Sequence, residues 1–270
     1  MSTKKLSASV LQAGRWVLSK PPVRRVIDRL GLQSSLSQTY WELLFRSSGG
    51  THVQRIDDTS VTFTAATASE FRHYRTLVDE RPVIADLLSQ LKPDDVFYDV
   101  GGYIGSYTCL AAAALQEGRV VTFEPRETKA ARIEANLSRN NLTADVRREA
   151  LSDEAGDATL SIDGVAQLST NGTEQVSLTT GDKLVERGEV PPPTVVKIDV
   201  EGAELDTITG LEKTLSRSDC RLVYCEVHPT FLGEYDASED DVRAALEECG
   251  FSIEIIHNRG AEYFIRGEKA

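Results

Sequence analysis

The sequence predicts an α/β fold: a doubly wound, mostly parallel sheet of seven strands with an antiparallel edge. From residue 96 onward, apolar runs of strand length alternate with segments of helical periodicity. Two of the runs, Val-Val-Thr-Phe at 120–123 and Val-Val-Lys-Ile at 195–198, are almost continuously apolar, which is typical of parallel strands buried on both faces. We place the sheet domain at residues 69–270, after a small helical and hairpin extension at residues 1–68.

The extension and the segment after it are predicted from local signals. Apolar residues recur at helical spacing on either side of Pro21-Pro22, and Asp57-Asp58-Thr59 separates two short strand-like runs. A longer helical pattern follows, and Pro93 predicts that this helix ends before residue 93. The predicted elements are helices Leu6–Leu18 and Val23–Leu30, strands His52–Ile56 and Ser60–Thr64, and helix Ser69–Leu91 with Ser69 as its N-cap.

The sheet domain follows from strands and helices in alternation, with a hairpin at the edge. Its predicted strands are Val96–Val100, Arg119–Glu124, Asp145–Ala150, Thr194–Val200, Arg221–Val227, Phe251–Ile256 and Tyr263–Arg266. Its predicted helices are Ile104–Gln116, Glu127–Asn140, Ala203–Ser216 and Ser238–Cys249, and Ala158–Ile162 with Gln175–Leu178 forms an added hairpin.

Charge and composition limit the classes of partner. The net charge is −12, but residues 1–50 carry eight Lys or Arg against two Asp or Glu. The acidic remainder repels nucleic acid, whereas the basic head suits peripheral contact with an acidic membrane surface or a solvated helix face. No apolar run reaches the length of a membrane span or forms a signal peptide, so a cytoplasmic location is expected.

A glycine-rich stretch after the first predicted strand indicates a ligand site. In Asp99-Val-Gly-Gly-Tyr-Ile-Gly105 the glycines would let the backbone approach a ligand closely. Such loops lie at the carboxyl ends of parallel strands, where α/β sheets bind ligands. Glu124 ends the next strand, nineteen residues after Gly105, and a carboxylate there can accept hydrogen bonds from ribose hydroxyls.

The spacing distinguishes between two nucleoside ligands. A dinucleotide site needs G-x-G-x-x-G, but Tyr103 stands where the middle glycine would be and the pattern is D-x-G-x-x-x-G. The carboxylate of Asp99, two residues before Gly101, would repel a pyrophosphate and attract a cationic amino group. S-adenosylmethionine (SAM) carries an ammonium, a sulfonium and a ribose, so the stretch favours SAM.

Five blocks together resemble the FkbM family of SAM-dependent methyltransferases. The resemblance covers roughly residues 70–266, and Lys197-Ile-Asp-Val-Glu-Gly-Ala-Glu204 is its most specific part. It implies a class I methyltransferase fold and methylation of an oxygen on a sugar or sugar-decorated product. The blocks are Asp99–Gly105, Phe123-Glu-Pro125, Ala150-Leu-Ser-Asp153, Lys197–Glu204 and Glu226-Val-His-Pro229.

The same resemblance implies the SAM contacts. Asp99, Gly101 and Gly105 would form the SAM loop, Glu124 with Pro125 would hold the ribose, and Ala150 with Leu151 would border the adenine. One departure affects affinity: the family usually has Ala-Asn where this chain has Gly102-Tyr103. The phenol of Tyr103 then replaces the asparagine's polar contact or that contact is lost.

A second constellation follows the fourth and fifth strands of the sheet. Asp199, Glu201, Glu226 and His228 should face the crevice and hold the acceptor. A sugar hydroxyl needs a base, whereas a carboxylate acceptor would need only positioning. His228 is the first candidate for the base because histidine titrates near neutral pH, and Asp199 or Glu201 is the second.

Three further interpretations stay open for these residues. His228 could instead serve a structural role before Pro229, and Glu201 could cap a helix. Lys197 and Glu204 are expected to pair as a buried bridge. Oxygen ligands with one imidazole would also suit magnesium or manganese, although the resemblance requires no metal and none is predicted.

The leading function is therefore a SAM-dependent O-methyltransferase acting on a sugar, uronic acid or glycan-type acceptor, which could be lipid-linked. The alternatives are a non-catalytic SAM-fold partner of a glycan-assembly enzyme and a nicotinamide-dependent oxidoreductase. The glycine spacing disfavours the oxidoreductase, and a fold alone never proves activity. Nothing in the sequence indicates the oligomeric state.

Overall fold

The computed structural model describes residues 33–160 and 174–269. The predicted helices Leu6–Leu18 and Val23–Leu30 lie outside these residues, as does the end of the predicted strand Ala158–Ile162. The chain divides into two compact units, one of residues 1–55 and 60–78 and one of residues 56–59 and 79–270. The sequence boundary at residue 68 stays a prediction.

The smaller unit contains a helix, a two-stranded sheet and a second helix. Phe63 and Tyr74 stack in its core with ring centroids 4.4 Å apart, and both are fully buried. The predicted hairpin is confirmed, with Asp57 at φ +47° in its turn. The elements are α3 (Gln33–Ser48), β1 (Thr51–Ile56), β2 (Thr59–Thr64) and α4 (Ala68–Thr76).

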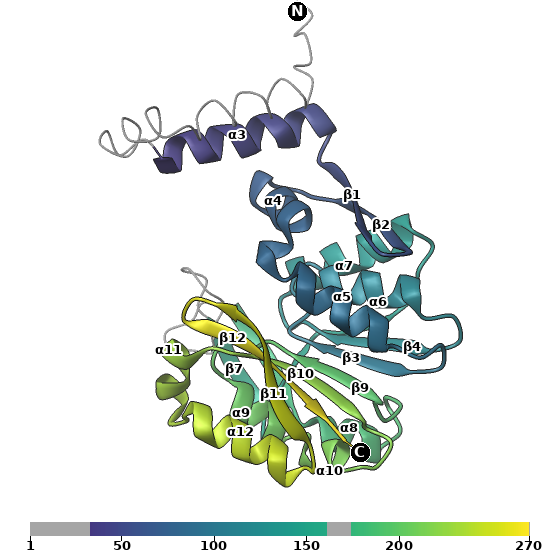
Figure 1. Ribbon diagram of the computed structural model, residues 1–270, viewed down its shortest axis with the longest axis vertical. Coiled ribbons are helices and arrows are strands. Elements are labelled where there is room, and N and C mark those ends of the chain that lie inside the picture. The colour runs from purple at the N-terminus through teal and green to yellow at the C-terminus, as the bar shows by residue number, and fades with distance from the viewer. Residues whose placement is uncertain (1–32, 161–173, 270) are drawn as a thin grey trace, which may run out of the picture. The chain divides into compact units, whose positions relative to one another are not determined.

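The larger unit alternates strands and helices as the sequence indicates (Figure 1). Its strands are β3 (Val96–Val100), β4 (Arg119–Phe123), β5 (Asp145–Arg147), β6 (Glu149–Leu151), β7 (Gly156–Leu160), β8 (Glu174–Thr179), β9 (Val195–Ile198), β10 (Leu222–Val227), β11 (Ser252–Arg259) and β12 (Glu262–Glu268). Its helices are α5 (Arg81–Gln90), α6 (Ser106–Ala114), α7 (Glu127–Arg139), α8 (Gly181–Glu186), α9 (Glu204–Thr209), α10 (Glu212–Leu215), α11 (Pro229–Leu232) and α12 (Glu239–Glu248), with short 3-10 turns η1 (Leu77–Asp79) and η2 (Gly233–Tyr235).

The predicted seven-stranded, mostly parallel sheet is confirmed. Its order is β11-β12-β10-β9-β3-β4-β5. The five strands from β10 to β5 are parallel, whereas β12 runs antiparallel to β10 and β11 antiparallel to β12. The chain therefore winds outward from β3 and returns at β9, so the topology switches between these two neighbours. The carboxyl ends of β3 and β9 define the crevice in which such sheets bind ligands.

Helices cover both faces of this sheet. Figure 1 shows α5, α6 and α7 along one face, and α8, α9, α10 and α12 along the other. The strands carry apolar side chains to both layers, and β9 and β10 are buried at every position. This double burial explains the near-continuous apolar runs in the sequence.

The predicted helix Ser69–Leu91 is wrong as a single element. The chain leaves helical geometry at Leu77, Val78 and Asp79, whose φ angles are +50°, +48° and +67°. A new helix, α5, then begins at Arg81 with Pro82 in its first turn, a position that proline tolerates because its missing N–H needs no partner there. The N-cap of α4 is Thr67, which accepts a hydrogen bond from the Glu70 amide, and not Ser69.

Two other predicted elements are also divided. The strand at 145–150 splits because β5 stays in the main sheet while β6 pairs with β8 in a separate three-stranded sheet. The helix at 203–216 breaks at Gly210, where a Cβ would lie 1.9 Å from the Ser152 carbonyl oxygen. Local periodicity does not reveal the strand division, because it depends on the pairing of β6 with the distant strand β8.

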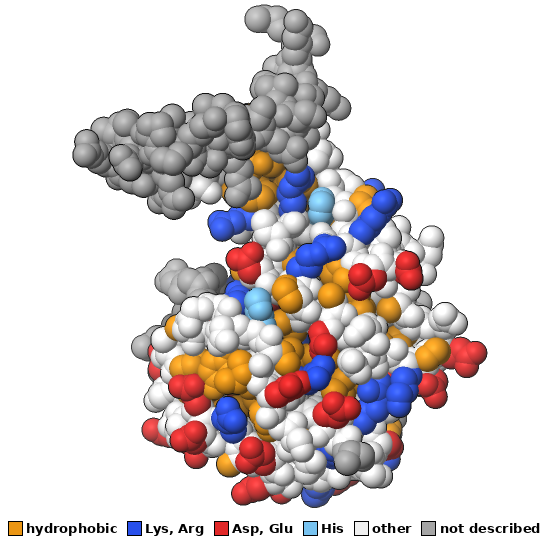
Figure 2. All heavy atoms as spheres, viewed as in Figure 1, with side chains coloured by type: hydrophobic (Ala, Val, Ile, Leu, Met, Phe, Trp, Pro, Cys, Tyr) orange, Lys and Arg blue, Asp and Glu red, His pale blue; other side chains and the backbone are white. Residues whose placement is uncertain are grey.

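The surface charge is mixed, and no helix among the described residues is long and apolar enough to cross a membrane. Figure 2 shows acidic side chains interspersed with Lys and Arg over the visible face. Short-range mixing of both signs suits a polar surface rather than a basic groove for a polyanion.

Gly101 gives a test of the switch-point geometry. A Cβ at this residue would lie 1.8 Å from the Asp199 carbonyl oxygen, and its φ is +79°. Gly101→Ala should therefore lower the free energy of unfolding by about 2 kcal/mol or more, from overpacking and left-handed strain. Urea denaturation measures this, with Gly156→Ala as the control because nothing lies within 4 Å of that position. Equal stabilities of the two variants would contradict the close approach.

Candidate active site

The glycine loop between β3 and α6 is held against the neighbouring strand. The amides of Gly101 and Gly102 both donate to the Phe123 carbonyl oxygen, at 3.0 and 3.1 Å. Gly105 is the N-cap of α6 with φ +86°, and Tyr103 between them has φ +48° and an exposed fraction of 39%. The loop therefore presents Tyr103 to solvent while its backbone follows the end of β4.

The glycines are required by the fold itself as well as being suited to a ligand. A Cβ at Gly102 would lie 2.2 Å from the Thr122 hydroxyl, and one at Gly105 would lie 3.2 Å from Ile133. With Gly101 against β9, the three positions allow the loop to pack on a strand at each side and on α7. The sequence analysis explained these glycines only by the close approach of a ligand, and did not foresee that packing within the fold also requires them.

Glu124 lies where the sequence places it, directly after β4. Its two carboxylate oxygens accept hydrogen bonds from the backbone amides of Tyr103 and Arg126, at 2.8 and 3.0 Å. Burial raises the pKa of Glu124 to about 7, against these two hydrogen bonds. Each carboxylate oxygen can accept a second hydrogen bond, so the group fits a ribose diol.

Asp99 is enclosed rather than open to the crevice. Its side chain is fully buried, and it accepts a hydrogen bond from the Thr108 hydroxyl at 2.5 Å. The ammonium of Lys197 lies 3.4 Å from its other oxygen. Asp99 is therefore not positioned in this structure to contact a ligand's amino group directly. The role of Asp99 in SAM binding stays a prediction.

Lys197 ties the two sides of the switch point together. Its ammonium donates to the Gly101 carbonyl oxygen at 3.0 Å and pairs with Asp199 at 3.1 Å. Burial alone would lower the pKa of Lys197, but the carboxylates of Asp199 and Asp99 raise it. The predicted bridge between Lys197 and Glu204 is wrong, because each of them pairs with other residues.

The predicted adenine-side residues lie on β6. Ala150 is partly exposed, whereas the side chain of Leu151 is buried in the core. The Leu151 carbonyl oxygen accepts a hydrogen bond from the Thr207 hydroxyl at 3.1 Å, so this backbone position is fixed. Pro125 follows Glu124 at partial exposure.

His228 lies among three carboxylates. Its Nδ1 is 2.6 Å from Glu204, and its Nε2 is 3.3 Å from Glu201 and 3.8 Å from Asp199. Both His228 and Glu204 are buried, with side-chain exposures of 2% and 0%. The same Glu204 oxygen accepts the Gly202 amide at 3.0 Å, which fixes the carboxylate that orients the ring.

The three carboxylates determine the charge of the imidazole. Burial alone would lower the pKa of His228, but Glu204, Asp199 and Glu201 raise it to about 9. At neutral pH the ring is therefore an imidazolium. The ring therefore already holds the proton that a general base would have to accept. The sequence analysis missed this charge because it paired Glu204 with Lys197 and not with His228.

Glu201 occupies a strained backbone position beside this ring. Its φ is +53°, a region that costs a non-glycine residue energy and that recurs at functional sites. Burial raises the pKa of Glu201 to about 7, while the nearby His228 lowers it. Its side chain is 33% exposed, the most open of the three carboxylates around the imidazole.

A second, half-buried cation, Arg259, lies beside these carboxylates, and the sequence analysis did not identify it. It ends β11, yet its guanidinium lies 2.5 Å from Glu226 and 3.1 Å from Glu80. Burial, Asp199 and Glu80 raise the pKa of Glu226 to about 9. Burial and Asp199 also raise the pKa of Glu80 to about 7.

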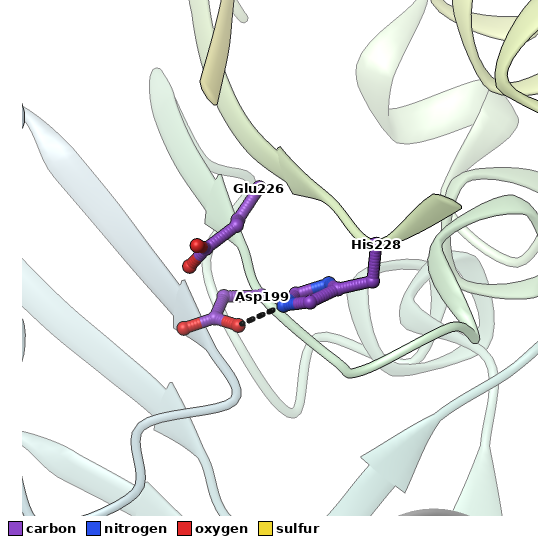
Figure 3. A group of neighbouring side chains, drawn as sticks. All are labelled: Asp199, Glu226 and His228. Carbon is purple, nitrogen blue, oxygen red and sulfur yellow. Dashed lines mark ion pairs between the residues drawn. The ribbon is translucent and has the colours of Figure 1, made fainter. Parts of the chain in front are cut away.

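Asp199, Glu226 and His228 also have the spacing of metal ligands. Figure 3 shows them together at the ends of β9 and β10, and one atom from each lies within 4.8 Å of the others. However, Lys197 and Arg259 already pair with the two carboxylates, at 3.1 and 2.5 Å. A divalent cation would compete with two fixed positive charges, so we assign no metal ligands here, and the lack of a metal stays a prediction.

Comparison with known proteins places this geometry in context. Residues 99–253 match the family described as "Methyltransferase FkbM domain". The hexuronic acid methyltransferase AglP of Haloferax volcanii is 32% identical over 80% of this chain and 88% of its own length. The 31-O-demethyl-FK506 methyltransferase FkbM of Streptomyces tacrolimicus is 29% identical over 61% of this chain and 75% of its own.

A solved structure supports the fold. The crystal structure of methyltransferase FkbM from Methylobacillus flagellatus KT aligns with a TM-score of 0.50 and 15% sequence identity. The alignment covers 91% of this chain and 59% of that one. At this identity the likeness concerns the fold alone.

The charge of His228 can be measured directly. Nuclear magnetic resonance of the ring nitrogens should give a pKa of about 9 in the wild-type protein. Glu204→Gln should move this pKa down toward 6.5, because the variant removes the closest negative charge and keeps an oxygen acceptor. Glu234→Gln, at an exposed position, is the control and should leave it near 9. A wild-type pKa at or below 6.5 would contradict the arrangement.

The buried acids also predict how stability depends on pH. Glu80, Glu124, Glu201, Glu226 and His228 all have pKa values raised above those of an unfolded chain. The folded state therefore binds more protons than the unfolded state from about pH 5 to about pH 9, so the free energy of unfolding should fall as the pH rises through that window.

Urea unfolding at about pH 6 and about pH 9 measures this dependence. Glu226→Gln should flatten its alkaline half, because Glu226 then no longer loses a proton there. A free energy of unfolding that increased toward pH 9 would show that these groups are not held protonated.

Proposed function

The chain belongs to the FkbM family of methyltransferases, and we propose that it transfers a methyl group from SAM to an oxygen of a hexuronic acid or related sugar in a glycan. The observation that carries this proposal is the similarity to AglP, a relative named as a hexuronic acid methyltransferase, over 80% of the chain. The family membership also argues against the alternative of a nicotinamide-dependent oxidoreductase.

The strand ends on the β3 and β4 side would hold SAM. SAM supplies an electrophilic methyl group on a sulfonium. The support for this seat is the pairing of the glycine loop with Glu124, whose buried carboxylate retains acceptor capacity for a ribose. Gly101, Tyr103 and Gly105 would line the donor, and Ala150 would border the adenine from β6.

The strand ends on the β9 and β10 side would hold the acceptor. Asp199 and Glu201 lie 3.8 and 3.3 Å from the Nε2 of His228. Lys197 pairs with Asp199 and donates to the Gly101 carbonyl oxygen, so it connects this group to the glycine loop. Such a connection would keep the acceptor oxygen in line with the methyl carbon. A lipid-linked acceptor and a membrane contact of the basic N-terminal segment stay predictions from the sequence.

Glu124→Gln tests the donor seat. The variant keeps the side-chain volume but replaces one accepting oxygen by an amide that donates. Loss of a charged hydrogen bond should weaken SAM binding by about 1.5–3 kcal/mol, roughly ten- to a hundredfold. Titration calorimetry with SAM measures the loss, and Glu127→Gln, an exposed carboxylate three residues later, is the control. Unchanged affinity in Glu124→Gln would remove Glu124 from the seat.

A further inference from the structure

The aromatic ring on the glycine loop already holds a positive charge. The ammonium of Lys129 lies 4.6 Å from the centroid of the Tyr103 ring, and Tyr103 is 39% exposed. The face of an aromatic ring carries partial negative charge and attracts cations at about this distance. Tyr103 therefore presents a cation-binding surface at the edge of the proposed donor seat.

The backbone of Tyr103 fixes this ring beside the proposed ribose acceptor. Its amide donates to a carboxylate oxygen of Glu124 at 2.8 Å, from a left-handed conformation with φ +48°. A ribose held by Glu124 would therefore lie within reach of the Tyr103 side chain. In SAM a single methylene carbon joins the ribose to the sulfonium, so the sulfonium is the charged group of the donor that lies nearest to the ribose.

Lys129 occupies the space that such a ligand would need. It stands in the first turn of α7 and is partly exposed. Burial raises the pKa of Glu124 to about 7, and the charge of Lys129 is among the influences that oppose this rise. One ammonium therefore lies near both the aromatic ring and the proposed ribose acceptor.

The chemistry of the two cations favours their exchange on the ring. A lysine ammonium has three N–H donors and is strongly hydrated, and a ring face replaces those hydrogen bonds poorly. A sulfonium has no hydrogen to donate, so it loses less when it leaves water. Aromatic faces accordingly bind fully alkylated cations well. The flexible four-carbon stem of Lys129 lets its ammonium return to water.

We propose that the Tyr103 ring exchanges the Lys129 ammonium for the sulfonium of SAM, and that this exchange makes the donor seat bind SAM more tightly than its product, S-adenosylhomocysteine (SAH). The inference rests on the proposed function and specifies how the seat distinguishes donor from product. During transfer the acceptor oxygen bonds to the methyl carbon while the carbon–sulfur bond breaks, and the electron pair of that bond leaves the sulfur neutral. Tyr103 then loses its attraction for the ligand, and Lys129 covers the ring again and favours release of SAH.

The residue type at position 103 decides whether the seat can distinguish the two ligands by charge. Asparagine, which the family usually has there, offers hydrogen bonds that SAM and SAH can use equally. An aromatic ring instead interacts with the charge that only SAM carries. Asparagine also tolerates the left-handed backbone of this position, so Tyr103→Asn removes the ring without adding backbone strain.

Titration calorimetry of the full-length protein with SAM and with SAH tests the proposal. Tyr103→Asn should lower the preference for SAM over SAH by about two- to thirtyfold, the range of one cation–π contact. Tyr103→Phe is the matched control, because it keeps the ring and should keep the preference. An unchanged preference in Tyr103→Asn would overturn the proposal. An equal loss in Tyr103→Phe would also overturn it, because the effect would then belong to the hydroxyl.

Lys129→Gln should give the opposite result. SAM has to displace this ammonium and SAH does not, so the preference for SAM over SAH should rise in the variant. Lys213→Gln is the control, because the ammonium of Lys213 pairs with Glu186 at the surface. A preference for SAM that fell in Lys129→Gln would show that Lys129 holds the ligand rather than competing with it, and the exchange would be wrong.

Nuclear magnetic resonance of the lysine ε-methylene groups observes the exchange without catalysis. In the free protein the ring current of Tyr103 should move the Lys129 signal upfield of an exposed lysine such as Lys213. Saturating SAM should return the Lys129 signal to the position of Lys213, whereas SAH should leave it upfield. A Lys129 signal that stays upfield with SAM bound would contradict the displacement.

These measurements separate two failures. Wild-type protein that binds neither SAM nor SAH would count against the proposed function and against this inference with it. SAM binding whose preference over SAH is the same in the wild-type protein and in Tyr103→Asn would overturn the exchange alone and leave the proposed function intact.

Discussion

The buried ammonium of Lys197 is the contact on which the site depends. It bonds the Gly101 carbonyl oxygen, Asp99 and Asp199 within 3.4 Å, and the ring of Tyr107 lies 5.0 Å away. Burying an ammonium costs several kcal/mol unless its partners replace water fully. Here the partners come from both strands at the topological switch, so one cation holds the glycine loop close to Asp199.

The cluster around Lys197 contains more carboxylates than cations. Asp99, Asp199, Glu201, Glu204, Glu226 and Glu80 are matched by Lys197, Arg259 and a protonated His228. Burial, and with it the nearby Asp199 carboxylate, raises the pKa values of Glu80, Glu201 and Glu226. The protons that these groups retain reduce the excess of negative charge. A cationic methyl donor would bring positive charge to a crevice that is short of it, which is consistent with the electrostatic argument for SAM over a dinucleotide.

Sequence patterns were sufficient for the sheet because each strand's identity is local. The strand predictions matched β3, β4, β9 and β10 to within two residues, and the edge hairpin was also predicted, although β11 continues to Arg259 beyond its predicted end at Ile256. Patterns failed where distant contacts decide the outcome. Gly210, which packs closely against Ser152, stands between α9 and α10, and Glu204 pairs with His228 rather than Lys197. The blocks do not show which charge neutralises which, and so they do not show the protonation of the histidine.

Arg259 shows why the reversed edge of the sheet matters for the site. Because β12 runs antiparallel to β10, with Tyr263 opposite Val227, the turn before β12 lies at the carboxyl end of β10. That turn follows Arg259, so its guanidinium reaches Glu226 beside the crevice. A parallel strand at this place would have put its own start, and any such arginine, at the far end of the sheet. The antiparallel hairpin therefore does more than close an edge, because it supplies the cation that pairs with Glu226.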